Sequence, residues 1–269
     1  MKKKRLIPVL LLKNGWLVQS RKFSRHQNLG NPMMAVRRLS QWASDELIYL
    51  DITRNDKYDM GRDDQGYKNN QSFLEIIEEV SRETFMPITI GGKIETLNDI
   101  EKRLKIGADK VAINTAAYTK KDFIMNAAKE FGSQCIVASV DYKKTENNKE
   151  SVFINRGRDN IDKKPIEWCK NLQEMGAGEI LVNSIDKDGS GGGYDLEVLN
   201  EISKKINIPV IACGGASEFS HFKDIIKDTN CDAAAAANIF HYQDQSIFLS
   251  KKYLHDNRCN VRKPELIDI

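Results

Sequence analysis

Two strand ends in this sequence stand at matching positions but carry different side chains. The stretch VLLLKNG (residues 9–15) aligns with SVDYKKT (139–145), so that Leu11 matches Asp141. Each residue follows a short apolar run, and enzymes with parallel strands place their reacting groups at the carboxyl ends of those strands. A carboxylate at such a position can transfer a proton, whereas a leucine cannot. The sequence therefore keeps only one of two symmetric positions for acid–base chemistry.

A second repeated feature has the composition of an anion site. Residues 86–118 align with residues 208–240, and in both segments a strand ends in Gly-Gly, a helix follows, and the next strand ends in small or polar residues. Glycine lets the backbone approach a phosphate, and the N–H groups at a helix N-terminus supply donors and a positive dipole end. A tight strand-to-helix turn would explain one such pair without a ligand. Two pairs at equivalent positions favour two phosphate sites on opposite sides of one mouth.

These positions require a framework of strands and helices that the sequence supplies. Eight short runs, rich in Ile and Val, are apolar on both faces, as buried parallel strands are; they are RLIPVLLL, ELIYLDI, PITIGG, KVAINT, CIVASVD, EILVNSID, PVIACGG and DAAAAAN. Amphipathic segments lie between them. We expect helices to begin at Asn31-Pro32, Ser72, Thr96, Thr119, Pro165, Asp195 and Ser217, with a last helix near residues 244–254.

Eight strand–helix units predict a (β/α)8 TIM barrel, in one domain that spans residues 1–269. The alignments indicate a half-barrel duplication, with repeats at about residues 1–130 and 131–255. A doubly wound open sheet is the alternative. That fold usually has GxGxxG after its first strand, and LLLKNGWLV has no such pattern.

Composition excludes several other classes of protein. The 269 residues are 41% hydrophobic with a net charge of +3, which gives no basic face for nucleic acid. No stretch approaches the ~18 apolar residues of a membrane span, and the apolar run after MKKKR is broken by Pro8 and lacks a signal-peptide cleavage site. Five cysteines without CxxC spacing predict reduced thiols in a cytosolic protein, with Cys135 and Cys213 in the core. The four histidines lack metal-ligand spacing, so we expect no metal.

Two long polar segments follow predicted strands. Residues 54–71 follow the second strand, and loops of this length are usually functional or disordered. We expect a mobile substrate lid there, and an insertion without a role is the alternative. Residues 143–164 follow the fifth strand, and SVFINRG within them predicts a small hairpin strand.

The chain resembles the cyclase subunit of imidazole glycerol phosphate synthase, a lyase family of histidine biosynthesis. The matching stretches keep their order over nearly the full length: RLIPVLLLKNG, DELIYLDIT, GADKVAINTAA, FGSQCIVASVD, GAGEILVNSIDKDGSGGGYD, IPVIACGGA and AAAANIFH. The resemblance implies a duplicated (β/α)8 barrel that needs no cofactor. It also implies a glutaminase partner at the amino-terminal face of the barrel, whose ammonia travels through the barrel to a diphosphorylated substrate at the carboxyl-terminal face.

The resemblance also assigns roles to individual residues. It implies that Asp141 is catalytic and that Asp109 and Gln134 contact the partner. The first phosphate site would comprise Gly92, Asn114 and Thr115, and the second Asp188, Gly189, Gly215, Ala237 and Asn238. A ring of charges that gates ammonia entry maps onto Arg5, Glu46, Lys110 and Glu179.

The four gate residues share a position that can be read directly from the sequence. Each begins an apolar strand, in RLIP, ELIYL, KVAIN and EILV, so all four should lie on the amino-terminal rim of the barrel. Charged residues flank strands in many proteins without any such role. Two acids and two bases that converge could nevertheless close the barrel as a neutral ring, and breaking one partner of such a cluster is expensive.

Four departures from the family pattern lie on the substrate side. Leu11 replaces the acid–base aspartate of the first strand, Lys93 a glycine of the first phosphate turn, Gln19 a lysine of the first loop, and Asn238 a serine of the second phosphate site. The first strand is similar to that of a branch found in surface-polysaccharide gene clusters, which make lipopolysaccharide O-antigen. That branch accompanies a glutaminase-like subunit and a sugar amidotransferase.

Three hypotheses follow from this pattern. The first, which the departures favour, is an ammonia-channelling subunit for conversion of an acetamido sugar to an acetamidino sugar. The second is the cyclase of histidine biosynthesis, tolerating Leu11. The third is a catalytically silent barrel that activates the glutaminase and conducts ammonia to a third protein. The sequence does not identify the ammonia acceptor.

Overall fold

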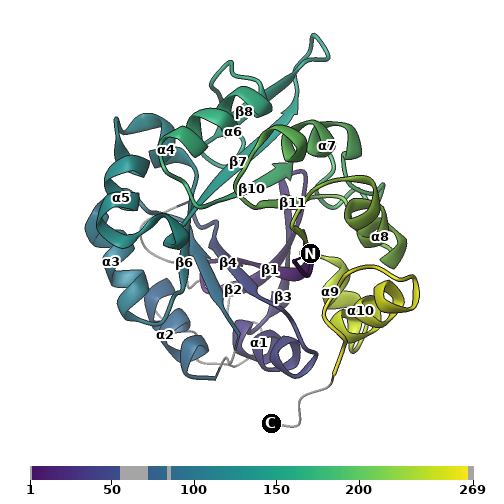
Figure 1. Ribbon diagram of the computed structural model, residues 1–269. Coiled ribbons are helices and arrows are strands. Elements are labelled where there is room, and N and C mark those ends of the chain that lie inside the picture. The colour runs from purple at the N-terminus through teal and green to yellow at the C-terminus, as the bar shows by residue number, and fades with distance from the viewer. Residues whose placement is uncertain (1, 55–71, 84–85, 266–269) are drawn as a thin grey trace.

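The computed structural model describes residues 2–54, 72–83 and 86–265, and its centre is a closed barrel of parallel strands (Figure 1). Each barrel strand pairs with the next, and β12 pairs with β1 to close the ring. The barrel strands are β1 (Arg5–Lys13), β4 (Leu47–Asp51), β5 (Ile88–Gly91), β6 (Lys110–Ile113), β7 (Ile136–Lys144), β10 (Glu179–Ser184), β11 (Val210–Cys213) and β12 (Ala233–Ala236). The predicted (β/α)8 barrel is confirmed.

Helices surround this barrel on its outside (Figure 1). They are α1 (Pro32–Gln41), α2 (Phe73–Glu83), α3 (Leu97–Lys105), α4 (Thr115–Thr119), α5 (Phe123–Phe131), α6 (Pro165–Glu174), α7 (Leu196–Lys205), α8 (Phe219–Asp228), α9 (Ile239–Tyr242) and α10 (Ser246–Asp256), with a 3-10 turn at Ser133–Cys135. Local chemistry explains their starts. Asn31 accepts a hydrogen bond from the Met33 N–H before Pro32, and Thr96 and Asp99 form a reciprocal capping box.

Two predicted helix starts are wrong. Thr119 does not begin a helix but ends α4, where its hydroxyl donates to the Thr115 carbonyl, and α5 begins only after Asp122, which has a left-handed backbone. The sequence pattern predicted Thr119 as the N-cap of α5, but it is the last residue of α4. At α8 the N-cap is Glu218 rather than Ser217.

Two hairpins extend the barrel at the carboxyl ends of β1 and β7. β2 (Trp16–Arg21) and β3 (Arg25–Gly30) run antiparallel after β1, and β8 (Glu150–Ile154) and β9 (Asp159–Asn160) do so after β7. The strand predicted in SVFINRG is thus confirmed, and its hairpin projects beyond the ring of helices (Figure 1). A Cβ built on Gly157 would lie 3.2 Å from the Phe23 ring, so the two hairpins approach each other over the mouth.

The apolar core has two parts, because barrel strands bury both faces. One part lies between the strands and the helices. The other fills the barrel interior and comprises Ile7, Val9, Ile48, Ala112, Val137, Leu181, Ile211, Cys213, Ala233 and Ala235. All five cysteines are free thiols, but Cys135 is only half-buried and does not belong to the core as predicted, since it lies in the turn before β7.

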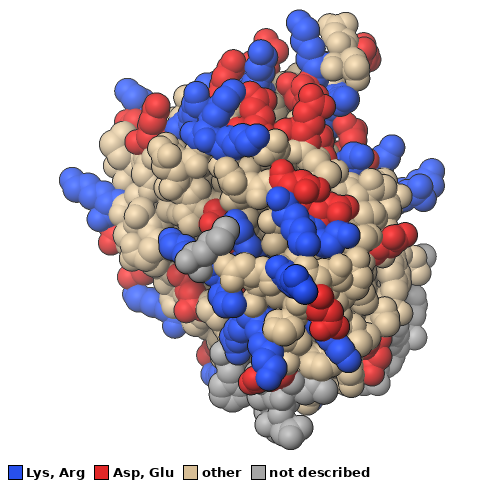
Figure 2. All heavy atoms as spheres, turned by 45° about the vertical axis from the view of Figure 1, so that its right-hand side comes forward, with Lys and Arg blue, Asp and Glu red and all other residues tan. Residues whose placement is uncertain are grey.

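The surface carries both signs of charge. Figure 2 shows basic and acidic side chains interspersed over the face in view, which accords with the net charge of +3. Among the described helices, none is long and apolar enough to cross a membrane.

Candidate active site and ion-pair ring

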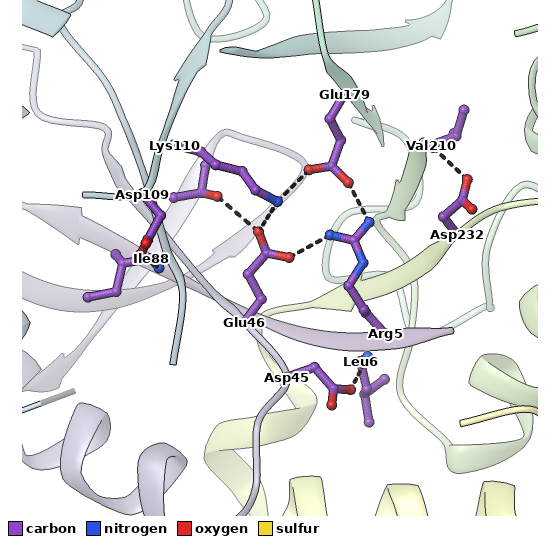
Figure 3. A network of polar contacts seen from close by, with 11 residues as sticks. Arg5, Leu6, Asp45, Glu46, Ile88, Asp109, Lys110, Glu179, Val210 and Asp232 are labelled. Carbon is purple, nitrogen blue, oxygen red and sulfur yellow. Dashed lines mark hydrogen bonds and ion pairs between the residues drawn. The ribbon is translucent and has the colours of Figure 1, made fainter. Parts of the chain in front are cut away.

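Four charged side chains form a closed ring of ion pairs at the amino-terminal end of the barrel (Figure 3). Arg5 Nη1 lies 2.6 Å from Glu46 Oε2, and its Nη2 pairs with Glu179 Oε1. Lys110 Nζ lies 2.5 Å from Glu46 Oε1 and 2.8 Å from Glu179 Oε2. Each residue begins a barrel strand or immediately precedes one, which is why the side chains meet on the axis. The structure thus brings the predicted gate residues together.

Electrostatics keep this ring charged and compact. The side chains of Glu46 and Glu179 are only 3% and 6% exposed. Burial lowers the pKa of Arg5 and of Lys110, but the two glutamates outweigh that effect and leave both pKa values raised. Two acids and two bases give no net charge, so the ring closes the barrel without an isolated buried ion.

Three aspartates around the ring satisfy backbone donors of neighbouring strands (Figure 3). Asp45 accepts from the Leu6 N–H at 2.9 Å, Asp109 from Ile88 at 2.8 Å, and Asp232 from Val210 at 3.1 Å. Asp109 is therefore held within the chain, although it is exposed at this end of the barrel. Gln134, the other predicted partner contact, is exposed just before β7, at the same end.

A buried lysine that the sequence analysis missed ties α10 to this rim. Lys251 is 0% exposed, and its Nζ lies 2.5 Å from both the Ala43 carbonyl and Asp45 Oδ1. Burial lowers the pKa of Lys251, and pairing with Asp45 opposes that effect. In the sequence it is one of two adjacent lysines on this helix, so no local signal separates it from the exposed Lys252.

The opposite end of the barrel contains a cavity of about 440 Å³. Its walls come from the carboxyl ends of the barrel strands and from the two hairpins. Asp141, Asp188 and Ala237 line it, as do the three residues predicted for the first phosphate site, Gly92, Asn114 and Thr115. Gly189, Gly215 and Asn238 of the predicted second phosphate site do not line it.

Asp141 has the environment of an acid–base group. It is 8% exposed, and Asn114 Nδ2 donates to its Oδ2 at 3.2 Å. Burial and the negative charge of Asp188 raise its pKa to about 7, against the opposing effect of Asn183. A carboxyl group with this pKa populates both protonation states near neutral pH, which suits a general acid or base.

Asp188 joins the β10–α7 loop to the first hairpin. It accepts from Ser20 Oγ at 2.7 Å and from the Phe23 N–H at 3.2 Å. Burial raises its pKa, and the hydrogen bonds from Ser20, Phe23 and Lys22 oppose this. The same hairpin receives Asn238, whose Nδ2 donates to the Ser20 carbonyl at 2.9 Å.

The two Gly-Gly turns differ in their third residue. Gly92 and Gly214 have positive φ angles of 101° and 96°, and the next residues, Lys93 and Gly215, have 51° and 108°. A lysine thus holds a left-handed backbone where its repeat partner is glycine. The buried Arg103 donates to the Gly92 carbonyl at 2.7 Å and fixes the first turn, while Lys93 Nζ lies 4.0 Å from Asp51 Oδ2.

Leu11 lies in the wall of the cavity and, like Leu50, packs against the apolar side chains of the barrel interior. In register, Leu11 faces Leu50 of β4, just as Asp141 faces Asn183 of β10. At matching positions of the two half-barrels, one strand pair thus carries two leucines and the other carries an aspartate and an asparagine.

Several residues that line the cavity were not identified from the sequence. Asp51 could have been found by the rule that found Asp141, because it ends the strand ELIYLD, whereas Ser20, Asn183 and Arg156 have no distinctive local pattern. The predicted lid at 54–71 lies outside the described residues except for Arg54, which lines the cavity. In the described part of the chain, no group of three His, Cys, Asp or Glu side chains could hold a metal ion.

Comparisons with known proteins show which family the chain is similar to. The family model described as histidine biosynthesis protein matches residues 5–246. The imidazole glycerol phosphate synthase subunit HisF of Hydrogenobaculum sp. (strain Y04AAS1) is 41% identical over 259 residues, which cover 96% of this chain and 98% of that protein. The subunit HisF of Oceanobacillus iheyensis is 40% identical over 260 residues, covering 97% and 98%. With its closed barrel and these full-length matches, the chain belongs to the histidine biosynthesis protein family that includes the HisF subunits.

Proposed function

We propose that this chain is the synthase subunit of a glutamine-dependent complex, in which ammonia enters at the ion-pair ring and reacts with a phosphorylated substrate in the cavity. The observation that carries the proposal is Asp141, an acid–base carboxyl with a pKa of about 7 in a cavity at the end of the barrel opposite the ring. The barrel interior between the two is lined by apolar side chains. Such a lining suits neutral ammonia rather than ammonium, because a charged ion would be costly there.

The partner in this proposal is a glutaminase docked on the ring end. Asp109 and Gln134 are exposed there, beside the strand starts that carry Lys110 and the turn before β7. A neutral ring is a suitable gate, since its ion pairs can exchange partners without leaving a net charge in the barrel.

The substrate groups are proposed to lie across the cavity. Gly92, Asn114 and Thr115 would hold one phosphate, at a turn and at the N-terminus of the next helix. Residues around the β10–α7 loop and β11–β12 would hold the other; these are Asp188, Gly189, Gly215, Ala237 and Asn238. We further propose that the two halves of the chain, about 1–130 and 131–255, are duplicated units, each supplying one phosphate site.

The reaction that fits the relatives' names best is formation of imidazole glycerol phosphate for histidine biosynthesis. In that reaction Asp141 would exchange protons with the substrate as ammonia adds and the ring closes. Leu11 can exclude water but cannot share the proton transfers.

One observation favours a second candidate. The apolar Leu11–Leu50 pair removes a carboxyl from the β1 end of the cavity, which is what we expect if ammonia is passed on to amidinate an acetamido sugar with the help of a sugar amidotransferase. In this second candidate function, the ion-pair ring and the glutaminase have the same roles, but the barrel catalyses fewer proton transfers.

The test is to assay the chain together with its glutaminase for imidazole glycerol phosphate formation from glutamine. We expect measurable turnover that falls sharply in Asp141→Asn and rises about tenfold or more in Leu11→Asp, since a positioned acid or base typically contributes ~10²–10⁴-fold. Turnover unchanged in Asp141→Asn would contradict the assignment of Asp141. No turnover in either the native chain or Leu11→Asp, with intact glutamine hydrolysis, would favour the second candidate.

A further inference from the structure

A buried cation, Arg103, lies behind the first Gly-Gly turn. The residue belongs to α3 and is 5% exposed, and it does not line the cavity, whereas Gly92, Lys93 and Ile94 of the turn do. A guanidinium keeps its charge in a protein, so its burial requires partners. Among the described residues, its hydrogen-bond partners are three backbone carbonyl oxygens, two of which belong to the turn. The charge of Arg103 is thus directed at the backbone of the turn.

These contacts connect the turn to α3. Arg103 Nη1 donates to the Asp99 carbonyl of its own helix at 2.8 Å. Its Nη2 donates to the Gly92 carbonyl at 2.7 Å and makes a longer contact of 3.4 Å with the Lys93 carbonyl. On the other side of the turn, a Cβ built on Gly92 would lie 2.3 Å from the Asp51 carbonyl oxygen. The turn is therefore held between Arg103 and the end of β4.

The geometry of the peptide bond relates these carbonyls to the cavity. In a planar trans peptide, the C=O of one residue and the N–H of the next point in opposite directions. Because the carbonyls of Gly92 and Lys93 face Arg103, the N–H groups of Lys93 and Ile94 point away from α3, on the side of the cavity that both residues line. Two successive N–H groups that point to one side form a concavity that suits an anion.

The internal repeat shows two linked differences at this turn. The alignment of residues 86–118 with 208–240 pairs Lys93 with Gly215 and Arg103 with Ile225. Lys93 and Gly215 both have positive φ angles, 51° and 108°, a conformation that glycine adopts readily and lysine does not. Ile225 is fully buried and has no side-chain donor. The half-barrel with a lysine in its turn is thus also the half with an arginine that binds the turn.

We propose that Arg103 is a positioning residue for the first phosphate site: it binds the carbonyls of the Gly92–Lys93 turn and thereby directs the N–H groups of Lys93 and Ile94 toward a phosphate of the substrate. The proposal rests on the proposed function only in taking this turn as a phosphate site. The guanidinium itself does not contact the phosphate, because it lies behind the cavity wall. It replaces the conformational preference that a glycine would give the turn.

The amide groups of the turn provide local probes for the test. The full chain is titrated with inorganic phosphate while the backbone amide resonances are followed by NMR. We expect the amide resonances of Lys93 and Ile94 to shift as phosphate is added, because the proton of an N–H that donates to an anion is deshielded. The amide of Gly215 reports on the second proposed phosphate site in the same sample.

Single substitutions on α3 separate positioning from charge. Arg103→Ile should weaken the phosphate affinity read at Lys93 and Ile94 about tenfold, which corresponds to the loss of one hydrogen bond to a charged group. The affinity read at Gly215 should stay the same. Arg103→Lys keeps the charge and a donor, and should weaken the affinity less. The matched control is Lys102→Ile, which removes a positive charge from the neighbouring, exposed position of the same helix and should leave both affinities unchanged.

A double substitution tests the link between Arg103 and Lys93. Lys93→Gly together with Arg103→Ile gives the first turn the residues of the second, and should recover most of the affinity lost in Arg103→Ile, because glycine adopts the conformation without the arginine. A merely structural role of Arg103 would lower the free energy of unfolding without changing phosphate affinity. Arg103→Lys and the double variant carry the test if Arg103→Ile does not fold.

The outcomes separate this proposal from the proposed function. A loss of affinity at Lys93 and Ile94 alone, recovered in the double variant, supports the positioning role. Equal affinity in Arg103→Ile and the native chain, or an equal loss in Lys102→Ile, would overturn that role and leave the phosphate site in place. No response of the Lys93 and Ile94 amides in the native chain would overturn the phosphate site itself, and the role of Arg103 with it.

Discussion

The two ends of the barrel solve opposite electrostatic problems. At the amino-terminal end, Arg5, Glu46, Lys110 and Glu179 satisfy one another in a neutral ring. At the carboxyl-terminal end, Asp141 is buried near a second acid, Asp188, and has a pKa raised to about 7. In the ring, each buried charge has an oppositely charged partner, so burial costs little free energy. In the cavity, Asp141 lacks such a partner among the described residues, and its raised pKa suits proton transfer near neutral pH. Substitutions should therefore affect stability at the ring and activity in the cavity.

The largest expected effect lies at the cavity end. Asp141→Asn should reduce turnover of the glutaminase complex by roughly 10²–10⁴-fold, because the amide cannot exchange a proton. The measurement is turnover with ammonia supplied directly, so that the result does not depend on the gate. A matched control is Asn183→Asp in the neighbouring strand, which adds a carboxyl at the paired position without removing Asp141. A loss in the control as large as that in Asp141→Asn would show that the charge balance of the wall matters more than Asp141.

The next largest effect is a loss of stability when one partner of the ion-pair ring is removed. Glu46→Gln leaves Arg5 and Lys110 with one carboxylate, and breaking a buried pair typically costs about 3–5 kcal/mol of unfolding free energy. The control is Glu101→Gln, because Glu101 and Lys105 pair at 2.5 Å, the same distance as Lys110 and Glu46, but with side chains 46% and 71% exposed. That exposed pair should contribute at most about 0.5 kcal/mol. Equal losses in chemical denaturation would mean that burial of the ring has no energetic consequence.

The sequence predicted the barrel strands and the positions of the ring residues more reliably than the interactions between distant residues. The eight strands and the ring positions could be predicted because buried parallel strands are short apolar runs and because a strand start places its side chain on the rim. The turn at Thr119 could not, since a capping residue looks the same at the end of α4 as at the start of α5.

Interactions between distant residues account for the rest. The pKa of Asp141 depends on burial and on Asp188, which lies in the loop after β10. The buried position of Lys251 depends on Asp45, which is distant in the sequence. Neither pairing leaves a pattern in the local sequence. The candidate site could thus be located at the strand ends, while its charge distribution required the structure.

The raised pKa of Asp141 should make the free energy of unfolding depend on pH. The pKa of Asp141 is about 7 in the folded chain against an ordinary value of 3.8, so its stabilising contribution is fully present below pH ~3.8 and is lost as the pH rises to 7. Asp141→Asn should therefore be more stable than the native chain by roughly 2–4 kcal/mol at pH 8, and about equal at pH 4. Denaturation at both pH values measures this difference. An unchanged difference between pH 4 and pH 8 would show that the carboxyl titrates normally.

The smallest effect concerns the cavity turn that departs from its repeat partner. Lys93 has φ 51°, a left-handed conformation that costs a non-glycine residue roughly 1–2 kcal/mol, whereas glycine loses about 0.5–1 kcal/mol more backbone entropy on folding. Lys93→Gly should thus stabilise the fold by about 0.5 kcal/mol, if the contact with Asp51 at 4.0 Å contributes little. Lys22→Gly is the control, because Lys22 has φ 52° and does not line the cavity. A smaller gain in Lys93→Gly than in Lys22→Gly would show that the Lys93 side chain stabilises the fold. A net loss of stability would mean that this contribution exceeds the backbone strain at Lys93.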